Sequence, residues 1–236
     1  MAKVSGITKT NNSVYRDNHA SGHCAKMTTH IETCKVLGLI NIKVLAAGSI
    51  FLGDMKEPIT GTKDGPKALN FGIPFTHRPK ALRYDYKVHV PGTPNRIRQT
   101  GFSKVTTVPG PDYCIAMLLL QKRHEDANGN ITAQRVGTVV VKYGKSTGGW
   151  VEDATYEIHY GNITGKSFYN AATMGLRSHD YARNSKGKSV LVKETGWAPA
   201  DATPTHIVLQ FSSSHGGAYV GTVGNTFWVD NVGLVY

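Results

Sequence analysis

Apolar and polar side chains alternate with a period of two along most of the chain. Residues 25–31 read AKMTTHI and residues 83–90 read RYDYKVHV, so each segment has one largely apolar row and one polar row. Such alternation predicts β-strands with one buried face and one face in water. Further strands are predicted at residues 39–51 (interrupted by Gly48), 113–121, 135–143, 154–160, 206–211 and 226–236.

The segments between these strands carry turn signals. Asn128-Gly129 predicts a hairpin, and residues 113–121 are apolar on both faces, which predicts a central strand. Some nine or ten strands without a helix of about twelve residues predict an all-β fold, a β-sandwich. Residues 161–203 break the rhythm as a long insertion, in which we expect a short helix near residues 169–176 and an extra hairpin around residues 190–192.

The length of 236 residues and the 40% hydrophobic content fit one globular domain. We expect residues 12–236 to form it and residues 1–11 to be a leader or the remnant of an added sequence. No apolar run approaches the roughly 20 residues of a membrane helix. The opening MAKVSGITKTNN is not a secretory signal, so the chain is either cytosolic or an exported protein whose signal has been removed.

The formal net charge is +11, and residues 61–120 contribute +6 of it. This excess predicts either a solvated basic surface or a site for an acidic polymer. Nucleic acid is not an expected partner, because the chain has no nucleic-acid-binding motif, basic helix or zinc finger.

The cysteines are Cys24, Cys34 and Cys114, an odd number that gives no complete disulfide framework. We interpret all three as small buried side chains, with a Cys24–Cys34 bridge as the alternative.

Three blocks carry a family resemblance. They are GSIFLGDM at residues 48–55, GIPFTHRPKALRYDYKVHVPG at residues 72–92, and PTHIVLQFSSSHGGAYVGTVGNTFWVDNVGLVY at residues 204–236. Together they resemble the putative carbohydrate metabolism domain of gut Bacteroidetes proteins. The resemblance implies a jelly-roll-like β-sandwich similar to carbohydrate-binding modules. It also implies export to the cell surface or periplasm, further domains upstream, and other surface glycan-uptake proteins as partners.

A sugar-binding sandwich combines aromatic faces, which meet the C–H face of a pyranose, with polar groups for the hydroxyls. The candidate contacts are Trp150, Trp197, Tyr84, Tyr86 and Arg78. The alternative for the two tyrosines is the core, and the alternative for Arg78 is a set of hydrogen bonds to loop carbonyls.

The case for catalysis from sequence is weak. A glycosidase needs two carboxylates about 5–9.5 Å apart, but Glu152 and Asp153 fall on opposite faces of an extended segment. Three serines before His215 do not predict a catalytic triad, because no orienting acid is near in the sequence. Turn capping by serine hydroxyls explains them.

The last predicted strand carries Trp228 and Asp230. We expect Trp228 to pack in the core or on the sheet. Asp230 and Asp17 are candidate ligands for a structural calcium ion if the two chain ends pair, because calcium takes carboxylate oxygens. The alternative for Asp230 is a hydrogen bond to a backbone N–H.

These observations predict a domain that binds an oligo- or polysaccharide without cleaving it. The positive net charge adds the hypothesis that this glycan is acidic. The domain would serve a cell-surface or periplasmic glycan-acquisition system. A glycoside hydrolase is the first alternative and a structural or adhesin-like surface module is the second.

Overall fold

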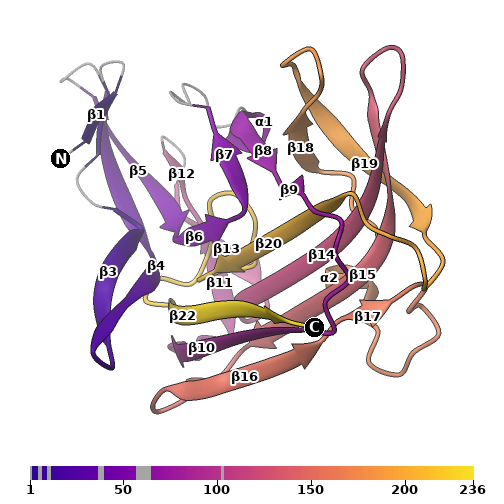
Figure 1. The fold of residues 1–236 in the computed structure, drawn as a ribbon. Helices are drawn as coiled ribbons and strands as arrows, with labels where there is room; N and C mark the ends of the chain where they lie inside the picture. The colour runs from indigo at the N-terminus through magenta and orange to yellow at the C-terminus, as the bar shows by residue number, and fades with distance from the viewer. Residues whose placement is uncertain (1, 5–6, 10–11, 37–39, 57–64, 102–103) are drawn as a thin grey trace.

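The structure is a computed structural model that describes residues 2–4, 7–9, 12–36, 40–56, 65–101 and 104–236. Two large β-sheets dominate it, and the predicted β-sandwich is confirmed (Figure 1). The jelly-roll connectivity within that sandwich stays a prediction. Among the described helices, none is long and apolar enough to cross a membrane.

The first sheet places the C-terminal strand in its middle. Its order is β1 (Ala2–Val4), β2 (Ile7–Lys9), β4 (Gly22–Val36), β22 (Thr226–Val235), β10 (Ala81–His89) and β16 (Val151–Glu157). Strands β3 (Val14–His19) and β5 (Ile40–Ala47) also pair with β4, and β12 (Thr100–Gly101) pairs with β5. Because β22 is hydrogen-bonded to β4 and β10, the end of the chain is tied to both halves of the sheet.

The second sheet is built around a long hairpin. Its order is β18 (Asp180–Arg183), β19 (Ser189–Trp197), β15 (Ile131–Tyr143), β14 (Cys114–Glu125), β20 (His206–Ser212) and β6 (Ser49–Phe51). Strand β17 (His159–Tyr160) pairs with β15, and β9 (Ile73–Pro74) pairs with β20. Gly129 has φ +85° in the turn that joins β14 to β15, so the predicted Asn128-Gly129 hairpin is confirmed. Strand β14 pairs with β15 on one side and β20 on the other, so it is a central strand, as predicted.

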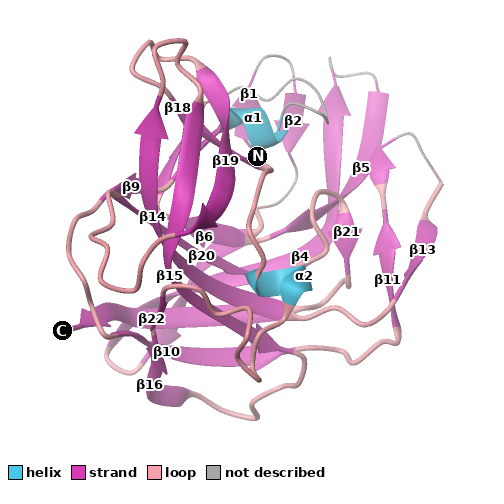
Figure 2. Cartoon of the chain, turned by 90° about the vertical axis from the view of Figure 1, so that its right-hand side faces the viewer, coloured by secondary structure: helices cyan, strands magenta, loops and turns pink. Residues whose placement is uncertain are grey.

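Smaller elements complete the described chain (Figure 2). Strand β11 (Asn95–Arg98) lies between β13 (Thr106–Pro109) and β21 (Val220–Gly221), and β7 (Gly53–Met55) pairs with β8 (Leu69–Phe71). The helices are α1 (Gly65–Ala68) and α2 (Ala171–Met174). The insertion at residues 161–203 contains α2 and the β18–β19 hairpin, as predicted.

One predicted boundary looks different in the structure, and one is as predicted. Residues 7–9 form β2, which pairs with β4, whereas the sequence suggested a leader outside the domain; the division of the chain into segments stays a prediction. Gly48 does separate β5 from β6. A Cβ at this position would lie 2.1 Å from the carbonyl oxygen of Ser13, so only glycine allows the backbones to approach this closely. Residue 39 lies outside the described residues.

The main core lies between the two sheets. The inward row of β10 and β22 contributes Leu82, Tyr84 and Phe227, which pack against Leu118 and Phe211 of the second sheet. All five side chains are at most 2% exposed. The period-two pattern therefore found the inward row of β10 correctly.

The other face of the second sheet is also covered, and it buries charge. Arg135 of β15 and Glu194 of β19 form an ion pair in which both side chains are fully buried. The oxygens of Glu194 also accept hydrogen bonds from Gln121 Nε2 at 2.6 Å and from the Arg177 backbone N–H at 2.7 Å. The parallel pairing of β15 with β19 depends on this satisfied network.

Cys24 and Cys114 are buried free thiols, in agreement with the prediction for these two. The side chain of Cys34 lies outside the described part of the structure. Cys114 Sγ donates to Ser213 O at 3.5 Å beside β20, and its second acceptor is Thr226 O at 3.8 Å on β22. The Cys114 thiol therefore bridges the two sheets.

The buried ion pair generates the first prediction. Replacement of Glu194 by Gln leaves the Arg135 charge without its partner, so the free energy of unfolding should fall by about 3–5 kcal/mol. Chemical denaturation measures this. The same chemical change at Asp153, whose contact with Arg83 is exposed, should cost less than about 1 kcal/mol. Equal effects of the two substitutions would contradict the prediction.

Candidate functional site

The outward face of the first sheet carries aromatic and cationic side chains in one row. Tyr15, Lys26, Trp228 and Lys87 are cross-strand neighbours on β3, β4, β22 and β10. Lys87 Nζ lies 4.3 Å from the Trp228 ring centre and Lys26 Nζ lies 5.4 Å from it. Both distances fit cation–π contacts. We call these four residues the Lys–Trp row.

A buried histidine joins this row to a group of acids. The imidazole of His19, at the end of β3, stacks on Trp150 with ring centres 3.7 Å apart. Its Nδ1 lies 2.8 Å from Asp230 Oδ2 and its Nε2 lies 3.2 Å from Glu152 Oε1. Lys87 Nζ lies 5.5 Å from the Trp150 ring, so the two tryptophans flank one lysine. We call His19, Asp85, Trp150, Glu152 and Asp230 the His19 site.

Asp85 holds two irregular backbone segments in this site. Its Oδ1 accepts the Asp153 backbone N–H at 2.6 Å, and its Oδ2 accepts the Asn231 side-chain amide at 2.6 Å. Asp153 and Asn231 have φ of +51° and +49°, in the left-handed region. Each lies where its strand's register with β10 shifts, which marks β-bulges on both sides of β10. Bulges re-aim side chains, and such strained residues cluster at functional sites.

The charges of the site are set by these hydrogen bonds. The hydrogen bond to Asp230 raises the pKa of His19 against the opposing effect of burial, with Glu152 adding to the rise. Burial alone would raise the pKa of Asp85, but hydrogen bonds from Asn231 and Asp153 lower it. His19 therefore binds a second proton more readily than an ordinary histidine, and its two ring nitrogens lie between the carboxylates of Asp230 and Glu152.

Three residues of the site could also hold a metal ion. Among the described residues, His19, Asp85 and Glu152 offer ligand atoms that all lie within 4.8 Å of one another. One nitrogen with two carboxylates suits a transition metal better than calcium.

The predicted calcium ligands have other partners. Asp17 accepts the Trp228 Nε1–H at 2.9 Å, which lowers the pKa of Asp17 to about 2, and it lies 3.4 Å from Lys26 Nζ. Asp230 accepts from its neighbour, the Asn231 backbone N–H, at 2.8 Å, as the alternative expected. Strand β4 lies between β3, which carries Asp17, and β22, which carries Asp230, so these two strands do not pair. Calcium at Asp17 and Asp230 stays a prediction.

The five predicted sugar contacts are placed apart from one another. Trp150 lies in the His19 site and is half-buried. Trp197 is half-buried at the end of β19, with the Arg135 guanidinium 5.6 Å from its ring and Tyr169 at 6.4 Å. The structure therefore does not bring the two tryptophans into one site.

Tyr84, Tyr86 and Arg78 take the structural roles that the sequence left as alternatives. Tyr84 is fully buried, so it offers no face to a ligand, and its hydroxyl meets the Tyr143 hydroxyl at 2.5 Å. Tyr86 packs against the main core, with its ring 4.6 Å from that of Tyr143. Arg78 donates to Ala202 O and to Ala200 O, and its guanidinium lies over the Tyr160 ring.

Several residues of the site were missed or misread from sequence. Trp228, expected in the core or packed on the sheet, lies on the outward face between Lys26 and Lys87, because Phe227 and Val229 occupy the inward row. Glu152 and Asp153 were assigned to opposite faces on the assumption of a regular strand, which the bulge interrupts. His19 gave no usable signal, because its partner Asp230 lies 211 positions away.

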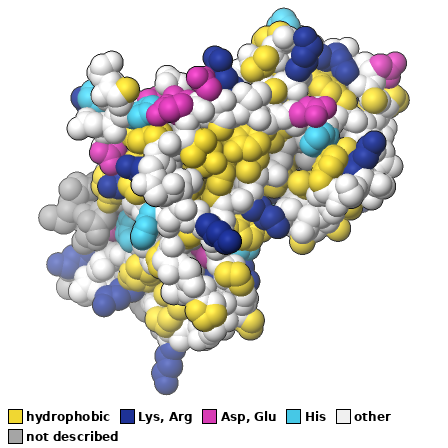
Figure 3. Space-filling model, turned by 90° about the horizontal axis from the view of Figure 1, so that it is seen from below, with side chains coloured by type: hydrophobic (Ala, Val, Ile, Leu, Met, Phe, Trp, Pro, Cys, Tyr) yellow, Lys and Arg dark blue, Asp and Glu magenta, His cyan; other side chains and the backbone are white. Residues whose placement is uncertain are grey.

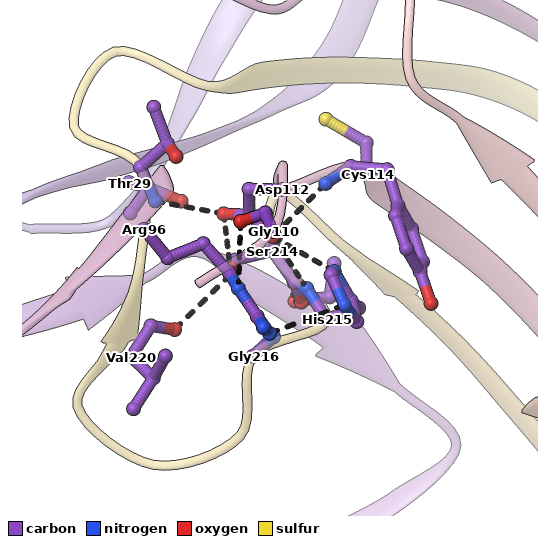
Figure 4. A network of polar contacts seen from close by, with 12 residues as sticks. Thr29, Arg96, Gly110, Asp112, Cys114, Ser214, His215, Gly216 and Val220 are labelled. Carbon is purple, nitrogen blue, oxygen red and sulfur yellow. Dashed lines mark hydrogen bonds and ion pairs between the residues drawn. The ribbon is translucent and has the colours of Figure 1, made fainter. Parts of the chain in front are cut away.

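The Ser–His segment after β20 does have an orienting acid, which corrects the sequence-based expectation. Asp112 Oδ1 lies 2.8 Å from His215 Nδ1, and Asp112 Oδ2 accepts Ser214 Oγ at 2.8 Å (Figure 4). His215 Nε2 faces Arg96 Nη1 at 3.4 Å, so no serine hydroxyl meets the imidazole as a nucleophile would. Burial alone would raise the pKa of Asp112, but hydrogen bonds from His215 and Ser214 lower it. The network holds a turn together, as predicted for the serines.

Comparison with known proteins identifies the family. Residues 3–235 match the family model of the putative carbohydrate metabolism domain. The chain belongs to this family. Among curated proteins, no relative matches the chain.

A solved structure supports the fold of this putative carbohydrate metabolism domain. It is the crystal structure of a putative glycoside hydrolase from Bacteroides thetaiotaomicron VPI-5482, with a TM-score of 0.54 and 18% sequence identity. The match covers 95% of this chain and 57% of the neighbour, so the domain spans little more than half of that protein. At this identity the likeness shows the fold alone.

The raised pKa of His19 generates the second prediction. A raised folded-state pKa means that the stabilisation from His19 is complete below about pH 6.5, the ordinary histidine value, and is lost as pH rises through the folded-state pKa. The difference in free energy of unfolding between the native protein and His19→Gln should therefore be largest near pH 6 and shrink towards pH 9. Urea titrations across this range measure it.

The control for this experiment is His89→Gln, at an exposed histidine of β10 in the same sheet. Its effect on the free energy of unfolding should be small throughout the range. A His19→Gln effect that stays constant from pH 6 to pH 9 would show that His19 carries no extra proton in the folded protein.

Proposed function

We propose that this domain binds carbohydrate without cleaving it, through the outward face of the first sheet. The observation that carries the proposal is the pair of half-buried tryptophans, Trp150 and Trp228, around Lys87 and beside the carboxylates of the His19 site. Membership of a carbohydrate-related family supports a saccharide ligand.

The chemistry of the site suits a sugar. Tryptophan rings pack on the C–H face of a pyranose, while carboxylates and ammonium groups hydrogen-bond its hydroxyls. The Glu152 side chain is 57% exposed, so its oxygens are open to a ligand. From below, apolar side chains gather in a central patch with acidic and histidine side chains beside it (Figure 3). The molecule therefore presents apolar and charged surface side by side.

Hydrolysis is the second candidate, favoured by the carboxylates themselves. Asp85 and Glu152 have oxygens within 4.8 Å of each other, close to the spacing of about 5–5.5 Å found in retaining glycosidases. Such an enzyme needs one carboxyl group with a raised pKa, and the pKa of Asp85 is lowered. The group of the site whose pKa is raised is the His19 imidazole, which lies between the carboxylates of Asp230 and Glu152. Binding is therefore the better-supported function.

The setting of this activity belongs to the same proposal. We place the domain at the cell surface or in the periplasm, within a glycan-acquisition system that includes other surface proteins. The net charge of +11 favours an acidic glycan, whose binding would weaken with added salt.

The third prediction tests the aromatic platform. Replacement of Trp150 by Ala removes the ring that stacks on His19 and should weaken binding of the best ligand from a glycan array by about tenfold or more. Isothermal titration calorimetry measures the affinity. The matched control is Phe168→Ala, at an exposed aromatic that stacks on His159, which should leave the affinity unchanged.

A measurement of reducing-sugar release on the same ligand separates the two candidates. Binding without release supports the binding module. Release that is lost in Glu152→Gln would replace it with the hydrolase, and tight binding that survives Trp150→Ala would place the ligand elsewhere on the domain.

A further inference from the structure

A pocket lies at the edge of the second sheet, where β14 ends. The pocket, of about 400 Å³, opens between the end of the β14–β15 hairpin, β18 and the start of β20. Its lining includes Arg123, Arg183, His206, Asn70 and Glu125. The volume is within the range of small-molecule sites, about 300–1,000 Å³. We call this hollow the Arg123 pocket.

Arg123 brings a fixed positive charge to the pocket. Its Nε donates to Gln121 Oε1 at 2.8 Å and its Nη2 donates to Phe71 O at 2.7 Å, so two uncharged acceptors hold the half-buried guanidinium in place. Nη1 has no hydrogen-bond partner in the described part of the chain. A planar guanidinium that is already positioned, with donors to spare, suits a carboxylate or a sulfate.

The neighbouring arginines differ from Arg123 because each forms an ion pair. The pairs are Arg135 with Glu194, Arg177 with Asp180, and Arg183 with Asp54. Arg123 has no such partner among the residues that the structure describes. Burial lowers the pKa of Arg123 to about 10, although the charges of Asp180 and Glu194 raise it, and an anion in the pocket would oppose the effect of burial further.

The carboxylate that lines the pocket is already engaged. Glu125 Oε1 accepts the Ser185 hydroxyl at 2.6 Å and its Oε2 accepts the Ser185 backbone N–H at 2.9 Å. Burial lowers the pKa of His206 to about 4, so its ring is neutral at pH 7 and adds a polar edge without charge.

The backbone also leaves room for the guanidinium. Gly72 has φ +91°, and a Cβ there would lie 2.9 Å from Arg123 Nη2. Glycine at this position therefore permits both the turn and the close approach of the arginine.

We propose that the Arg123 pocket is a second ligand site, which binds the carboxylate or sulfate group of an anionic sugar. The inference deepens the proposed function and rests on it for the sugar part of the ligand. Arg123 binds the anionic group, and the Nε2 edge of the His206 ring binds a hydroxyl, because its Nδ1 already lies 2.9 Å from Thr205 Oγ1. The outward face of the first sheet and this pocket would then hold two parts of an acidic glycan or two separate chains.

The fourth prediction is tested by NMR titration of the native protein at low ionic strength. The probes are D-glucuronate, its uncharged methyl ester, D-glucose and inorganic sulfate. Glucuronate should shift the amide resonances around the pocket and bind at least about tenfold more tightly than the ester or glucose, because only the anion engages Arg123. Sulfate should compete with glucuronate.

Two variants locate the effect. Arg123→Gln should weaken glucuronate binding by about tenfold or more, and Lys122→Gln removes the same charge from an exposed neighbour on β14 without changing it. If Arg123→Gln unfolds the protein, Arg123→Lys keeps the charge but loses the two-pronged geometry, and its affinity for glucuronate should fall by a smaller factor.

The opposing outcomes are distinct. Equal binding of glucuronate and its ester, unchanged affinity in the Arg123 variants, or binding of sulfate alone would each overturn the second site. Trp150→Ala should leave glucuronate binding at the Arg123 pocket intact. Failure of the proposal for the outward face would therefore show separately from failure of this one.

Discussion

The carboxylate of Asp85 is the constraint on which the candidate site depends. It lies on the strand between β16 and β22, is 5% exposed, and holds a bulge in each neighbour through Asp153 and Asn231. Two strained backbone conformations persist only where the surroundings stabilise them, and a buried acceptor for both segments supplies that stabilisation. The bulges in turn bring Glu152 and Asp230 to His19, so the geometry of the site follows from one buried acid.

The strands and the sandwich were predictable from the sequence because period-two patterns report burial directly. The inward row of β10 was evident from Tyr84, Tyr86 and Val88, whereas that of β22 was not assigned. The site was not predictable to the same degree, because alternation fails where a strand bulges, as at Asp153. Pairs such as His19 with Asp230 join distant parts of the chain, and no local spacing reports them. Two residues of the site were singled out in advance: Trp150, from its position after two glycines at the start of a strand, and Asp230, as a candidate calcium ligand.

The two sheets use charge in different ways. On the first sheet, charged groups lie on the outward face beside tryptophans, where solvent and ligand can reach them. On the second sheet, Arg135 of β15 and Glu194 of β19 are fully buried, and their ion pair joins these two neighbouring strands. Arg123 lies between these two situations, since it is anchored by uncharged acceptors and open on one side. The basic character of the protein thus divides into structural and accessible parts.

The reactivity of the Cys114 thiol reports how often the two sheets of this protein separate. The side chain is fully buried, desolvation raises its pKa, and its Sγ touches carbonyls from both sheets. Because the Cys114 side chain is fully buried, a thiol reagent can reach it only when the two sheets separate. Burial also suppresses the thiolate, which is the reactive form, as long as the sheets are packed together. The rate of Cys114 modification therefore reports how often the sandwich parts under native conditions, without any engineered probe.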